Sequence, residues 1–263
     1  SLDPQIATDG TSFEVIADYT DGLMQMDADG AAVPALAETY DISEEQLKTV
    51  ADMIGKAERP FIYYGGGVEI SDAGSELLAL MRKAEIPSAH TMMAIGCVPD
   101  DDELSLGMIG MHGSQASNVA VNECDLLVAV GCRFSDRVAS DPKTFAAGAK
   151  IVQIDIDRAE IDKNVLTDHH IIGSARHVLA LLNARMPQYH HEAWKQYILP
   201  MRAPSMAEDS ETLNPQQILD VIQHGTPEGT IISTDVGQNQ MWAIKYLHFS
   251  YPGQLLTSGG PNH

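Results

Sequence analysis

Three short apolar runs, each ending in glycine or acidic residues, limit what this chain can fold into. They are FIYY (61–64), DLLVAVG (125–131) and KIVQIDID (150–157), and helical patterns separate them. Continuous apolar runs of this length are typical of strands buried on both faces of a parallel sheet. Strands that alternate with helices predict βαβ units, so from Ile42 onward we expect an α/β fold with a doubly wound parallel sheet. Such sheets bind ligands at the carboxyl ends of their strands.

The remaining elements follow from capping residues and from apolar periodicity. Ser43 and Gln46 have capping-box spacing, which predicts a helix over the apolar positions that follow. A helix entered at Asn214-Pro215 is expected near the C-terminus, because Pro suits the first helical turn. The run after that helix predicts a buried strand that ends in glycine, GTIISTDVG (229–237). We also expect short strands at 88–93 and 169–173 and helices around 77–81, 114–122 and 174–186.

Two glycine clusters lie beside the predicted strands. The triplet Gly65–Gly67 follows FIYY directly, and Gly107, Gly110 and Gly113 precede the helix expected at Ser114. Glycine-rich turns that open helices bind phosphates, because free backbone N–H groups point outward there. The spacing matches neither the G-x-G-x-x-G fingerprint nor a P-loop. A diphosphate-bearing cofactor is one interpretation, and glycines that only shape the loops are the other.

Charged residues follow the second and third apolar runs. Arg133 and Arg137 lie just beyond Gly131 and suit bidentate binding of phosphate. Asp155, Asp157 and Glu160 end the third run, where their carboxylates suit the hydroxyls of a ribose or ribityl chain. Acidic residues at the end of a strand also cap the next helix, and that alternative stays open.

Composition excludes some partners. The formal net charge of −21 argues against nucleic acid and anionic membranes, which bind basic surfaces. No apolar run is long enough to span a membrane, and no signal peptide precedes the chain as given. Three cysteines without a Cys-x-x-Cys pair suit a reducing, cytoplasmic compartment. The pairs His169-His170 and His190-His191 predict surface or packing histidines, so we expect no metal site.

Four stretches, in order, resemble the large subunit of acetolactate synthase, a family of thiamine-diphosphate enzymes. They are YYGGGV, GMIGMHGSQASNVAVNECDLLVAVGCRFSDRV, AKIVQIDIDRAEIDKN and TDVGQNQMWAIKYLHFSYPGQLLTSGG, and the resemblance covers about residues 42–260. It implies a Rossmann-like middle domain that binds a structural FAD. His112 to Arg133 matches one family motif and Asp155 to Ser174 another, with Ser174 standing where Asp is usual. Together with the residues argued above, the expected flavin site comprises Gly65, Gly66, Gly67, Thr91, Met92, Gly110, Met111, His112, Gly113, Gly131, Arg133, Asp136, Arg137, Asp155, Ile156, Asp157, Glu160, Gly173 and Ser174.

The resemblance also implies a second cofactor near the C-terminus. Gly237, Gln238 and Asn239 match the strand end that contacts the phosphates of thiamine diphosphate in the family, where His is common at the last position. The family's Asp-Gly…Asn motif for Mg²⁺ and its catalytic Glu domain have no match here, so we assign no catalytic residue and no metal ligand. We therefore expect a fragment with a truncated second α/β unit that does not make acetolactate alone. Family members are homo-oligomers.

The first 43 residues have a different character. They contain no Lys or Arg, and they resemble the start of the solute-binding proteins of peptide ABC transporters. We expect an acidic segment at 1–42 that marks a fusion junction, a middle domain at 43–187, a linker at 188–212 and the truncated unit at 213–263. Alternatives are another thiamine-diphosphate enzyme such as glyoxylate carboligase or pyruvate oxidase, a non-catalytic nucleotide-binding or flavin-binding module, and a peptide receptor.

Overall fold

The computed structural model describes residues 24–26, 32–34, 42–202, 213–227 and 229–257. The chain divides into two compact units, 1–41 and 42–263. In the first unit, β1 (Met24–Met26) and β2 (Ala32–Pro34) form an antiparallel pair. The rest of the acidic segment, and with it the predicted resemblance to solute-binding proteins, lies outside the described residues.

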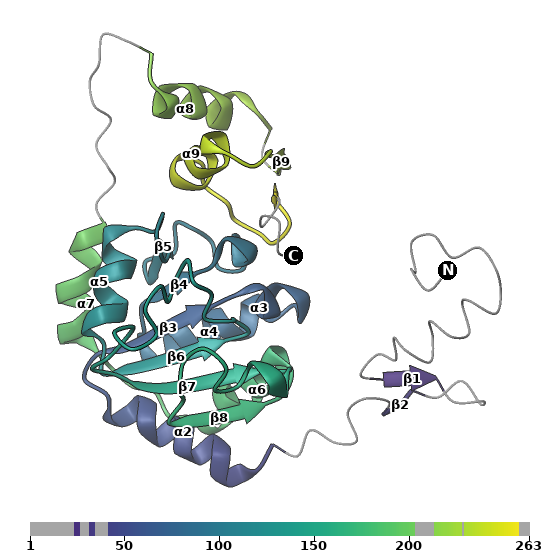
Figure 1. Ribbon diagram of the computed structural model, residues 1–263, viewed down its shortest axis with the longest axis vertical. Coiled ribbons are helices and arrows are strands. Elements are labelled where there is room, and N and C mark those ends of the chain that lie inside the picture. The colour runs from purple at the N-terminus through teal and green to yellow at the C-terminus, as the bar shows by residue number, and fades with distance from the viewer. Residues whose placement is uncertain (1–23, 27–31, 35–41, 203–212, 228, 258–263) are drawn as a thin grey trace. The chain divides into compact units, whose positions relative to one another are not determined.

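The second unit is built on a six-stranded parallel sheet (Figure 1). Its strand order is β5-β4-β3-β6-β7-β8, and each neighbouring pair is parallel. The chain therefore builds the sheet outward from β3 in one direction and then outward from β6 in the other. The strands are β3 (Pro60–Tyr64), β4 (Ser88–His90), β5 (Ser105–Met108), β6 (Leu126–Val130), β7 (Lys150–Asp155) and β8 (His169–Ile172).

Helices cover both faces of this sheet, as the expected doubly wound fold requires. Side chains alternate between the faces along each strand. Ile62 and Tyr64 of β3 pack with helices α2, α4 and α6, while Phe61 and Tyr63 pack with α5 and α7. The helices are α2 (Glu44–Lys56), α3 (Gly66–Ile70), α4 (Gly74–Ala84), α5 (Gln115–Glu123), α6 (Ala175–Arg185) and α7 (Glu192–Ile198), with 3₁₀ turns η1 (Met92–Ala94), η2 (Arg158–Glu160) and η3 (Leu199–Arg202).

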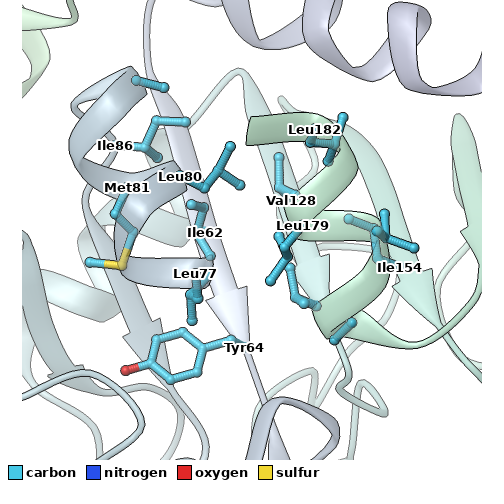
Figure 2. Close-up of a cluster of buried hydrophobic side chains, with 14 of the residues drawn as sticks. Ile62, Tyr64, Leu77, Leu80, Met81, Ile86, Val128, Ile154, Leu179 and Leu182 are labelled. Atoms are coloured by element: carbon cyan, nitrogen blue, oxygen red, sulfur yellow. The ribbon is translucent and has the colours of Figure 1, made fainter. Parts of the chain in front are cut away.

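The larger core lies between the sheet and α4 and α6. Figure 2 shows its centre, where Ile62, Val128 and Ile154 of three adjacent strands meet leucines from the two helices. Leu77, Leu80, Leu179 and Leu182 have no exposed surface. Burying a side chain of this size contributes about 1.5 to 3 kcal/mol, so this layer fixes the positions of the strand ends.

Capping residues set the helix starts as the sequence predicts. Ser43 and Gln46 form the reciprocal capping box of α2, and Ser114 accepts a hydrogen bond from the Ser117 N–H at the start of α5. Asn214 and Gln217 form a second capping box at α8 (Pro215–Gly225), with Pro at the first turn. These three predictions are confirmed.

Two expectations need correction, and one strand was not predicted. The stretch at 229–237 is not a buried strand, because only Ile232–Ser233 (β9) pairs, with Leu255–Leu256 (β10), and Ser233 is exposed. The predicted strand at 88–93 ends at His90 and continues as a 3₁₀ turn. Strand β5 was not predicted, because its sequence, SLGM, contains a glycine and is too short to show a period.

Candidate functional site

The sheet has a switch point between β3 and β6, where the order of strand addition reverses. Open α/β sheets bind ligands in the crevice that forms there, beyond the carboxyl ends of the strands. The turns after these two strands are Gly65–Gly67 and Gly131, the glycines expected to approach a ligand. They contact each other: the Gly67 N–H donates to the Gly131 carbonyl over 2.9 Å.

Close packing of these two turns explains their glycines. A Cβ atom on Gly67 would lie 2.6 Å from the Gly131 Cα, and one on Gly65 would lie 2.7 Å from the Gly131 carbonyl oxygen. Gly131 also has φ +55°, a conformation that side chains disfavour. The glycines therefore first of all let two backbone turns meet at the switch point.

The second glycine loop, residues 107–113, is held by the helix that follows it. The Asn118 side chain pairs with both backbone groups of Gly110, and the Ser117 hydroxyl donates to the Met108 carbonyl. The N–H groups of Gly113 and Ser114 also donate within the loop. These donors are used internally. Gly110, Met111, His112 and Gly113 nevertheless follow β5, and Met111 and His112 are exposed.

The residues after β6 contain two exposed arginines. Cys132 and Phe134 point into the core, while Arg133, Asp136 and Arg137 are exposed. The Arg137 carbonyl accepts a hydrogen bond from the Met111 N–H over 3.0 Å, so the turns after β5 and β6 are in contact. A depression of about 320 Å³ lies beside this contact, and Gly110, Met111, Asn118 and Arg137 are among the residues that line it.

The acidic residues after β7 hold the turn that contains them. Asp155 is 8% exposed and accepts a hydrogen bond from the Asp157 N–H. Burial raises the pKa of the Asp155 carboxyl, and the nearby charge of Glu160 raises it further. Asp157 caps η2 by accepting from the Ala159 N–H, and Ile156 is exposed. Capping by Asp157 confirms the alternative interpretation for that residue, which leaves Asp155 as the buried carboxyl of the group.

The turn that follows β8 contains Gly173 and Ser174. The Gly173 N–H donates to the Asp155 carbonyl, which places this turn beside the end of β7. Ser174 is the N-cap residue of α6, yet its side chain makes no capping bond. Its hydroxyl is therefore not needed for the helix start.

The residues after β4 contain a polar atom without a partner. The Thr91 N–H donates to the Tyr64 carbonyl of the neighbouring strand, but the Thr91 hydroxyl is buried and has no hydrogen-bond partner among the described residues. A buried hydroxyl without a partner costs about 1 to 3 kcal/mol. Met92 follows it and packs toward the C-terminal elements.

Gly237, Gln238 and Asn239 do not follow a strand of the six-stranded sheet, because they come after β9 of the two-stranded sheet. They open α9 (Gln238–Tyr246), whose N-cap residue Gly237 has φ +145° and offers no side-chain cap. All three are exposed. The predicted residues that follow β3 to β8 therefore lie along one edge of the six-stranded sheet, whereas these three open a helix that follows another sheet.

The sequence analysis identified only some of the arginines that lie at these strand ends. Of the eight arginines, five donate to a carboxylate or a carbonyl: Arg59, Arg82, Arg176, Arg185 and Arg202. Among the described residues Arg133, Arg137 and Arg158 have no such partner, and all three follow the carboxyl ends of β6 and β7. The sequence analysis missed Arg158 because this residue stands among acidic residues. Its position directly after a predicted strand was the signal that could have identified it.

Comparison with known proteins shows the family to which this chain belongs. Residues 47–182 match the family described as thiamine pyrophosphate enzyme, central domain. The chain belongs to this family. The matched range begins in α2 and ends in α6, so it contains the whole six-stranded sheet. The resemblance stated from the motifs is confirmed.

Relatives with assigned names agree. The chain is 45% identical to a probable acetolactate synthase large subunit of Methanocaldococcus jannaschii over 82% of this chain and 38% of that protein. It is 38% identical to the acetolactate synthase large subunit of Corynebacterium glutamicum (82% and 36%) and 36% identical to acetolactate synthase isozyme 1 large subunit of Escherichia coli (89% and 41%). The chain thus spans about two fifths of the length of these relatives. In the described residues, no helix combines the length and apolarity that a membrane crossing requires.

Proposed function

We propose that this chain is the cofactor-binding part of an acetolactate synthase large subunit and that it binds FAD at the switch point. The observation that carries the proposal is the position of Arg133, Arg137 and Arg158. In a chain of net charge −21, these guanidinium groups have no ion-pair or hydrogen-bond partner among the described residues, and they stand at the sheet end where α/β folds bind ligands.

The residues present fit a flavin dinucleotide. Arginine binds phosphate oxygens bidentately, so the three arginines suit the diphosphate. The Thr91 hydroxyl is buried and has no partner in the part of the chain that the structure describes, so it offers a hydrogen bond to a polar group of a ligand. Asp155 supplies a carboxylate for a sugar or ribityl hydroxyl, and exposed Met111 supplies apolar contact for a ring. In this proposal FAD is bound for structure, and the chain's own residues orient it.

The reaction and its other cofactors are part of the same proposal. Thiamine diphosphate supplies the decarboxylation of pyruvate and its joining to a second 2-oxo acid. Gly237, Gln238 and Asn239 open α9 without a side-chain cap, so their N–H groups suit a phosphate of that cofactor. Mg²⁺, a cytoplasmic location and assembly as a homo-oligomer are proposed from the relatives' family, and no described residue is assigned to the metal.

An absorbance scan from 350 to 500 nm, before and after addition of FAD, tests the flavin site. We expect a flavin spectrum that stays with the desalted protein. Arg133→Ala and Arg158→Ala should each weaken FAD binding roughly tenfold or more, because a hydrogen bond to a charged group contributes about 1.5 to 3 kcal/mol.

Arg185→Ala is the matched control, since Arg185 pairs with Glu44 away from the strand ends and its loss should leave FAD affinity unchanged. No retained flavin and no spectral change on titration would overturn the proposed site. Equal weakening by all three variants would show an effect of net charge and not of position.

A further inference from the structure

One aspartate in the connection between β4 and β5 forms two hydrogen bonds with the C-terminal elements. The Asp100 N–H donates to the Phe249 carbonyl over 3.0 Å, and the Asp100 carboxylate accepts from the Phe249 N–H over 2.9 Å. Both backbone groups of Phe249 are therefore bound by a single residue 149 positions away. The Asp100 carbonyl in turn accepts from Arg202.

Apolar contacts surround this pair of hydrogen bonds. Ile95 packs with Ala243, Leu247 and Phe249 in a small buried cluster. A Cβ on Gly96 would clash with the Tyr251 carbonyl oxygen, so the two backbones are in direct contact there. Asp100 binds Phe249 at the edge of this cluster, where its side chain is 17% exposed.

A buried histidine stands behind Asp100. His90 is 3% exposed, and its Nδ1 lies 3.1 Å from the Thr91 carbonyl. A carbonyl oxygen only accepts, so this geometry places a hydrogen on Nδ1. Nε2 then faces the second carboxylate oxygen of Asp100 across 3.7 Å. Burial lowers the pKa of His90 and raises that of Asp100, and the attraction between the two groups opposes both shifts.

We propose that Asp100 is a positioning residue: oriented by His90, it holds Phe249 and thereby fixes helix α9 on the β4–β5 connection. Phe249 lies three residues after the end of α9, so the hydrogen bonds to Phe249 fix the position of that helix. The first turn of α9 carries Gln238 and Asn239. These contacts join residues of the chain itself, so the inference does not rest on FAD binding.

Hydrogen exchange of the Phe249 amide in the full chain tests this assignment. Asp100→Ala removes the acceptor, and the amide should exchange roughly tenfold faster or more, as expected for local opening. Asp100→Asn keeps an acceptor for Phe249 and offers an N–H to His90 Nε2, so exchange should stay within about threefold of the unaltered chain. Asp101→Ala is the matched control, because Asp101 is the exposed neighbour of Asp100 and the proposal gives its side chain no role in holding Phe249. Amides of β6 should stay protected in every variant.

Two results would overturn the proposal. One is unchanged exchange in Asp100→Ala, and the other is exchange in Asp100→Asn as fast as in Asp100→Ala. Nitrogen-15 spectra of His90 in the unaltered chain give a test that needs no variant. Nδ1 should carry hydrogen throughout the range from about pH 5 to 8, and a neutral ring with hydrogen only on Nε2 would contradict the assigned orientation.

Discussion

At the scale of single residues, Gly131 has two reasons to be glycine. Its φ of +55° disfavours a side chain, and a Cβ would lie 2.7 Å from the Gly67 Cα. Neither backbone turn can move without disturbing the end of a buried strand, because Gly131 also donates its N–H to Ile154 of β7. A side chain at this position would therefore reduce the stability of the fold, whether or not a ligand is bound.

Gly131→Ala should therefore destabilise the chain by about 1 to 3 kcal/mol, as overpacking and backbone strain do. Chemical denaturation measures the free energy of unfolding. Gly148→Ala is the control, since a Cβ there meets nothing within 4 Å and the backbone has no positive φ, and its effect should stay within about 0.5 kcal/mol. Equal stability of the two variants would show that the turns at the switch point can separate.

At the scale of elements, helix α7 belongs to the packing of the sheet. The predicted linker 188–212 contains α7, whose Trp194 is buried and donates its indole N–H to the Pro60 carbonyl over 2.9 Å. Trp194 also stacks on Tyr197, with 5.8 Å between ring centroids. Residues 203–212 of that range lie outside the described residues.

Trp194→Ala should cost about 3 to 5 kcal/mol of unfolding free energy, because it leaves a cavity against the sheet. Trp194→Phe keeps most of the apolar contact and loses the hydrogen bond, so about 1 to 2 kcal/mol is expected. Tyr197→Phe keeps the stacked ring on a side chain that is 47% exposed, and it should change stability by less than about 0.5 kcal/mol. Urea titrations of the three variants give the comparison. Equal losses in all three would mean that α7 does not pack on the sheet.

The parts that could be predicted from the sequence are those with local signals. The apolar runs gave β3, β6 and β7, and Ser43 with Gln46 gave the start of α2. The expected turns after the strands also meet at one edge, because all six strands are parallel.

What could not be predicted depends on distant neighbours. Asp157 reads the same whether it binds a sugar or caps η2. The contact between Gly67 and Gly131 joins turns that have strands β4 and β5 and their helices between them in the chain, and the contact between Asp100 and Phe249 also joins residues far apart in the chain. The brevity of β9 follows from its single short partner, β10, which no local pattern reveals.

At the scale of the whole molecule, the net charge of −21 acts against compactness. Carboxylates that crowd one chain repel each other. Ion pairs such as Lys48–Asp52 and Arg176–Asp72 are exposed and contribute little.

Added salt should therefore raise the melting temperature of this chain. Raising NaCl from about 0.01 M to about 0.1 M shortens the screening length from about 30 to 10 Å, which weakens the repulsion between carboxylates more than the short-range ion pairs. Thermal unfolding followed by circular dichroism measures the change. A melting temperature that falls with salt would show that attractive pairs dominate.

Arg133, Arg137 and Arg158, which pair with no side chain in the described part of the chain, also affect how an anion approaches the molecule. Most charged side chains of the chain are acidic, and beyond the carboxyl ends of β6 and β7 the three guanidinium groups stand beside carboxylates such as Asp136 and Asp157. Attraction at one place and repulsion elsewhere steers encounters, and steering acts on the rate of association. In the proposed function, the polarity of a parallel sheet, which places every strand end of one kind at the same edge, would thus influence how fast a charged ligand arrives as well as where it binds.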